Sequence, residues 1–67
     1  MIHTSPHALW FQTIPGYHAQ VCLVNDLYRY EIFENVTGHR VHMHSLDTLA
    51  QAKAAVLDLF TNMKGLV

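Results

Sequence analysis

The sequence predicts one α+β domain over residues 1–67: an antiparallel β-meander of three to four strands, with one long C-terminal α-helix packed on one face. Three observations predict it. Turn dipeptides separate strand-like segments in the first two thirds of the chain. The last third is rich in Ala, Leu and Lys, which favour helix. The chain is 51% hydrophobic over 67 residues, which is enough for one small core.

The β-meander is predicted over residues 8–44, after a loose N-terminal lead-in at residues 1–7. Its strands are aromatic, β-branched or alternating in polarity. The predicted strands are 8–14, 17–24, 27–34 and 39–44. Pro15-Gly16 and Asn25-Asp26 suit two-residue turns, because Gly, Asn and Asp tolerate a positive φ. Residues 35–38 are predicted to form a four-residue loop.

The three turns place apolar side chains on the same face of the sheet, because cross-strand partners share a face. The first two hairpins set Val21 opposite both Trp10 and Tyr30. The loop at 35–38 is then expected to set Ile32 opposite Val41 and Tyr30 opposite Met43. A slip of one residue would turn a whole strand over, so the agreement of three turns supports the meander.

The helix is predicted over residues 46–64. Ser45 is a good N-cap candidate, with Asp47 as its competitor, and Gly65 stands where a C-terminal glycine belongs. The apolar side chains recur at helical spacing and are expected to cover the apolar face of the sheet. The predicted stripe is Leu46, Leu49, Ala52, Val56, Leu57, Phe60 and Met63.

This order of strands and a final helix resembles a pattern found in small meander-plus-helix proteins. The residues concerned are Thr48-Leu49 and the helix start at Ala52-Lys53-Ala54-Ala55. Antitoxins of the HicB type and short phage accessory proteins, anti-CRISPR proteins among them, show comparable patterns. The motif Thr-Leu-x-x-Ala is short, so the resemblance assigns no catalytic or binding residue.

Composition argues against several classes of protein. A net charge of -1 with four basic residues lacks the basic patch of a nucleic-acid binder. No apolar run approaches the length of a membrane span. The single cysteine, Cys22, cannot form an internal disulfide, which favours a reducing compartment and hence the cytoplasm.

The sheet face away from the helix is expected to bind a protein partner, because one helix covers only one face. Interfaces favour aromatic residues and Arg and are poor in Lys. The expected partner-binding residues are Phe11, His18, Gln20, Arg29, Glu31, Phe33, Arg40, His42 and His44. We expect a small, non-catalytic intracellular regulatory protein, such as a phage or mobile-element inhibitor of the anti-CRISPR type. A homodimer is expected, since small domains without disulfides often need a second copy.

Two alternatives stay open. His42-Met43-His44 is a His-x-His pattern that aims both imidazoles at one face of a strand. With Glu31 or Cys22 it would form a Zn²⁺ or Ni²⁺ site. The other alternative is a single-stranded RNA platform of aromatic and Arg side chains. It would use Phe11, Phe33, Arg29 and Arg40.

Catalysis is not expected, and neither is a cofactor. Cys22 could pair with His18 or His42 as a nucleophile, and His18 with Glu31 as an acid–base pair. A lone Cys on a strand is more often a small apolar filler. The chain has no glycine-rich phosphate loop and no Gly-x-Ser-x-Gly motif. No catalytic residue is therefore assigned.

Overall fold

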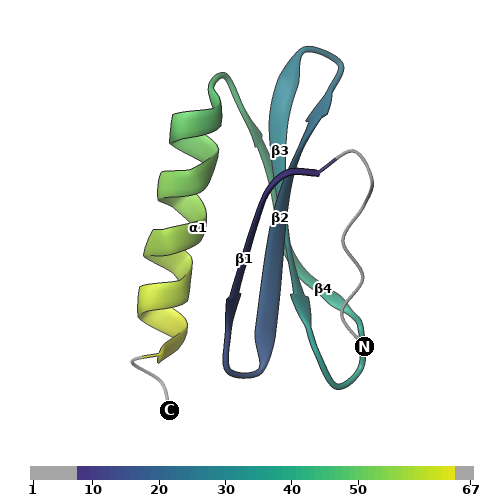
Figure 1. Cartoon of the computed structure of the whole chain (residues 1–67), viewed down its shortest axis with the longest axis vertical. Helices are drawn as coiled ribbons and strands as arrows, with labels where there is room; N and C mark the ends of the chain where they lie inside the picture. The colour runs from purple at the N-terminus through teal and green to yellow at the C-terminus, as the bar shows by residue number, and fades with distance from the viewer. Residues whose placement is uncertain (1–7, 65–67) are drawn as a thin grey trace.

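A computed structural model describes residues 8–64, and it shows four strands in one antiparallel sheet followed by a helix (Figure 1). The predicted α+β fold is confirmed, with four strands in the order β1-β2-β3-β4. The elements are β1 (Ala8–Ile14), β2 (Tyr17–Val24), β3 (Leu27–Glu34), β4 (Arg40–Leu46) and α1 (Leu49–Lys64). The predicted lead-in at residues 1–7 and the predicted helix stop at Gly65 lie outside the described residues.

The first two hairpins have the predicted turns, and their register is as predicted except at the start of β1, where a bulge at Leu9 sets Ala8 opposite Cys22. Asn25 and Asp26 have φ angles of 52° and 65°, and two positive φ angles are the mark of a type I′ turn. Gly16 has a φ of 90°, a positive value that glycine adopts without steric strain and that the ring of proline excludes. Val21 pairs with Trp10 on β1 and with Tyr30 on β3, as predicted.

The connection between β3 and β4 has the predicted loop, but the predicted register holds only as far as the first residue of β4. The Glu34 amide donates to the His39 carbonyl at 2.9 Å, so residues 35–38 form the expected loop. Phe33 then pairs with Arg40, but Ile32 pairs with His42 instead of Val41. Val41 is therefore the extra residue of a β-bulge. The predicted register was wrong from there to the end of β4, because one inserted residue turns the following side chains to the other face.

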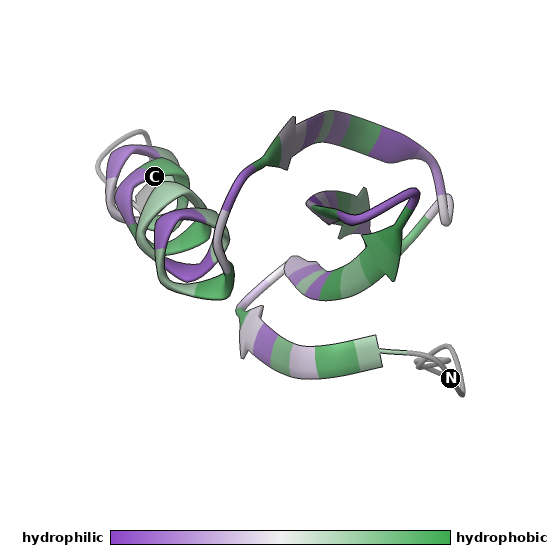
Figure 2. Ribbon diagram, turned by 90° about the horizontal axis from the view of Figure 1, so that it is seen from above, coloured by the Kyte–Doolittle hydropathy of each residue, from purple (hydrophilic) through white to green (hydrophobic). Residues whose placement is uncertain are grey.

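The core lies between α1 and one face of the curved sheet (Figure 2). Ala52, Val56 and Phe60 are buried, because residues four positions apart share one side of a helix. The fully buried residues opposite them on the sheet are Ala19, Val21 and Ile32. Leu57 was wrongly predicted in the stripe and is 48% exposed, whereas Leu59 packs against the core.

The helix begins at Leu49, three residues later than predicted, because Thr48 caps it. The Gln51 amide donates to Thr48 Oγ1 at 3.1 Å, and the Thr48 amide donates to Gln51 Oε1 at 3.2 Å. This reciprocal pair is a capping box. Ser45, the predicted cap, belongs to β4, and Asp47 precedes the helix. Within residues 8–64, no helix has the length and apolar character needed to span a membrane.

Candidate functional site

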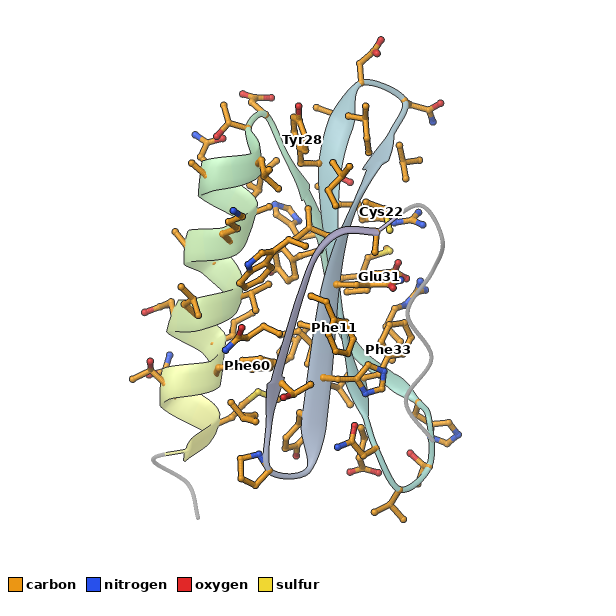
Figure 3. All side chains as sticks on the ribbon, in the orientation of Figure 1. Phe11, Cys22, Tyr28, Glu31, Phe33 and Phe60 are labelled. Atoms are coloured by element: carbon orange, nitrogen blue, oxygen red, sulfur yellow. The ribbon has the colours of Figure 1, made fainter. Side chains whose placement is uncertain are left out.

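Among residues 8–64, α1 packs on only one side of the sheet, and we call the other side the open face. The register assigns its members, and Figure 3 shows Glu31 and Phe33 on the side of the sheet away from α1. The open face comprises Ala8, Phe11 and Thr13 on β1, His18, Gln20 and Cys22 on β2, Arg29, Glu31 and Phe33 on β3, and Arg40, Met43 and Ser45 on β4. Seven of the nine predicted partner-binding residues are on this face.

Glu31 is the centre of the open face, and its side chain is held by three others. The residue is only 7% exposed. Arg40 Nη1 donates to Glu31 Oε2 at 2.9 Å, and Arg29 Nη2 lies 3.7 Å from Glu31 Oε1. Gln20 Nε2 donates to the same Oε1 at 3.4 Å. We call these four residues the Glu31 cluster.

Strand geometry explains how the Glu31 cluster assembles. Arg29 and Glu31 are two residues apart on β3 and so point to the same side. Arg40 enters from β4 at the position opposite Phe33, and a long side chain reaches its diagonal neighbour across a strand pair. The arginine side chains are 33% and 46% exposed, so the cluster presents a net positive edge around a buried carboxylate.

Three rings form a row beside the Glu31 cluster. His18 stacks on Phe33, with ring centroids 5.3 Å apart and planes at 17°, and its centroid lies 6.0 Å from that of Phe11. His18 Nδ1 donates to Asn35 Oδ1 at 2.6 Å, which fixes the orientation of the imidazole. These half-buried rings, which we call the aromatic row, have little freedom left to lose when a partner covers them.

His42 and His44 were predicted on the open face, and that placement was wrong. The bulge at Val41 sets them opposite Ile32 and Tyr30, on the side that α1 covers. Both remain exposed at the edge of the sheet, where the His44 ring lies 6.3 Å from the ring of Tyr30. They therefore lie off the open face, where both were predicted to contact a partner.

The predicted metal site is not assembled for the same reason. Glu31 lies on the opposite side of the sheet from His42 and His44. Among residues 8–64, no three His, Cys, Asp or Glu side chains are grouped to hold a metal ion. The His-x-His pattern alone supplies two imidazoles, whereas a zinc site has at least three protein ligands.

The candidate catalytic pairs are placed differently: Cys22 is kept apart from both histidines, whereas His18 stands diagonal to Glu31 on the open face. Cys22 is buried on the open face, and His42 lies on the other face. His18 is four residues from Cys22 along β2, which is about 13 Å in a strand. The carboxylate of Glu31 is bound by the two arginines.

Met43 was expected in the core and is the main residue that the sequence prediction missed. It lies opposite Glu31 on the open face and is 47% exposed. Val41, also predicted inside, is exposed at the bulge. In the sequence, polar and apolar residues alternate over 39–44, and this pattern predicts that Val41 and Met43 face the helix. No other pattern in the sequence would have placed these two side chains correctly.

Comparisons with known proteins yielded no relative. No protein-family model, no curated protein and no solved structure matches this chain. The function of the chain is therefore inferred from the chemistry of its open face.

Proposed function

We propose that the chain is a small, non-catalytic protein-binding module whose contact surface is the open face. One observation carries the proposal. Half-buried aromatic rings, an exposed Met43 and both arginines of the chain accompany a buried carboxylate on the sheet face that α1 does not cover. Figure 3 labels Phe11, Glu31 and Phe33 of this face.

The composition of the open face supports a protein partner. Aromatic residues, Met and Arg are enriched at protein interfaces, and Lys is depleted. Both arginines of the chain are on the open face, and both lysines, Lys53 and Lys64, are on α1. Arginines held by Glu31 and stacked rings lose less conformational entropy on binding than free side chains do.

Charge distinguishes a protein partner from RNA. On the open face, the formal charges of Arg29, Arg40 and Glu31 sum to +1. Because the net charge of the chain is -1, all other residues together carry a net charge of -2. A single net positive charge gains little from a phosphate backbone, whose binding depends on neutralising many phosphates. It does fit an apolar protein surface that carries a carboxylate. We therefore favour the protein partner over the RNA platform.

The proposal is tested by affinity capture from an extract of the native host, followed by quantitative mass spectrometry. Two variants alter the open face: Phe33→Asp in the aromatic row and Arg40→Glu in the Glu31 cluster. Leu57→Asp is the matched control, since Leu57 is apolar and exposed but lies on α1. Circular dichroism confirms that each variant is folded.

We expect the wild type and Leu57→Asp to retain the same protein partner. Each open-face variant should weaken its binding by about tenfold or more, the usual cost of altering a central interface residue. The proposal would be contradicted if the wild type and all three variants captured the same proteins equally well. It would also be contradicted if only Leu57→Asp lost the partner.

A regulatory or inhibitory role, of the kind that short phage and mobile-element proteins have, is the more specific form of this proposal. Its support is the small size of the described fold and the separation of Cys22 from His18 and His42 on the described sheet. We also propose a cytoplasmic location, supported by a single cysteine, Cys22, that is buried in the structure.

A further inference from the structure

Among the strands that the structure describes, β4 is one edge of the sheet and is far more exposed than the other edge, β1. Six of its seven residues are exposed, against two of seven in β1. An edge strand presents unpaired backbone N–H and C=O groups, which proteins usually protect with Pro, Lys or a bulge. β4 has no Pro and no Lys, and its bulge at Val41 leaves His42 to Leu46 in regular pairing with β3.

We propose that β4 pairs antiparallel with β4 of a second copy of this chain. The two four-stranded sheets then form one continuous sheet across a two-fold axis. The proposal depends on the edge of β4 and not on the open face, so it holds whether or not the open face binds another protein.

The side chains of β4 suit a second copy as the occupant. The two-fold axis of an antiparallel strand pair is perpendicular to the sheet, so each residue meets one that points to the same side. Met43 therefore meets an apolar or small open-face residue of the other copy, and His42 and His44 meet histidines. Such apolar and aromatic cross-strand pairs stabilise a sheet.

Charge does not oppose this pairing. Arg40 is the only Lys, Arg, Asp or Glu in β4. It stands at the first position of the strand, and antiparallel pairing sends the two copies of this residue to opposite ends of the interface.

The dimer would place both helices on one side of the joined sheet and both open faces on the other. Two copies of a binding surface on one side raise the apparent affinity for a repeated or dimeric partner. The regular part of β4 is short, so the interface is small and the dimer is expected to form and dissociate with concentration.

The test is the molar mass of the full chain by sedimentation equilibrium over a range from about 10 µM to 1 mM. We expect the mass to rise from 7.7 kDa toward twice that value. Met43→Lys should weaken self-association at least about tenfold, because it brings like charges together at a short interface. Thr13→Lys is the matched control, an exposed open-face position on β1, the other edge.

Amide hydrogen exchange of the unaltered protein gives a second measurement that needs no variant. Amides of His42 to Ser45 should exchange more slowly at high concentration, whereas amides of β1 should not change. A constant mass of 7.7 kDa up to 1 mM would overturn the proposal. So would an equal effect of Thr13→Lys and Met43→Lys, or protection confined to β1.

Discussion

Glu31 is the residue on which the arrangement of the open face most depends. Its buried carboxylate accepts from Arg40 and Gln20 and lies close to Arg29, so it positions three side chains that come from three strands. The sequence predicts its face correctly, since residue 31 alternates with Tyr30 and Ile32 on a strand whose register was right. It also places Arg40 opposite Phe33, as observed, but it predicted His42 opposite Glu31, and so it did not single out Arg40 as the partner of the carboxylate.

Glu31→Gln keeps the shape of the side chain and removes its charge. We expect a loss of about 1–3 kcal/mol in the free energy of unfolding, because two arginines then face each other without a carboxylate. Arg40→Ala should cost less, about 1 kcal/mol or under, since Arg40 is half-exposed and its ion pair is screened by solvent. Urea unfolding measures both, and a larger effect of Arg40→Ala would contradict this view of the cluster.

At the scale of elements, the local signals were sufficient for the pairing of β1 to β3 from Trp10 onward, and not for the bulge at Leu9 or for β4. Asn25-Asp26 and Pro15-Gly16 specify tight turns through their own backbone preferences, so the register of β1 to β3 follows from them. The bulge at Val41 is a tertiary feature. Strand alternation describes a strand without insertions, so it could not predict that His42 and Met43 would exchange faces.

The start of α1 gives a prediction at the same scale. Thr48→Ala removes the side-chain oxygen that accepts from the Gln51 amide and should cost about 1 kcal/mol of stability. Ser45→Ala should stay within about 0.5 kcal/mol, because this exposed strand residue caps nothing. Thermal unfolding of the two variants distinguishes them, and equal losses would show that the helix starts elsewhere.

At the scale of the molecule, one helix can bury only one face of the sheet. Ala52, Val56 and Phe60 cover that face, and the side chains left outside are the ones that we assign to binding. The sequence predicts this division, because the helical stripe and the sheet alternation are both visible in it. It could not predict that the histidines at 42 and 44 would join the covered side, since a single bulge on an edge strand decides that.

Photo-crosslinking from the open face tests most directly whether that face is the contact surface. The chain is made with p-benzoylphenylalanine in place of Phe33, or in place of Leu57 on the outer surface of α1. It is then irradiated in an extract of the native host. We predict a discrete crosslinked protein from position 33 and none from position 57. A crosslink from position 57 with none from position 33 would show that the helix, and not the open face of the sheet, is the contact surface.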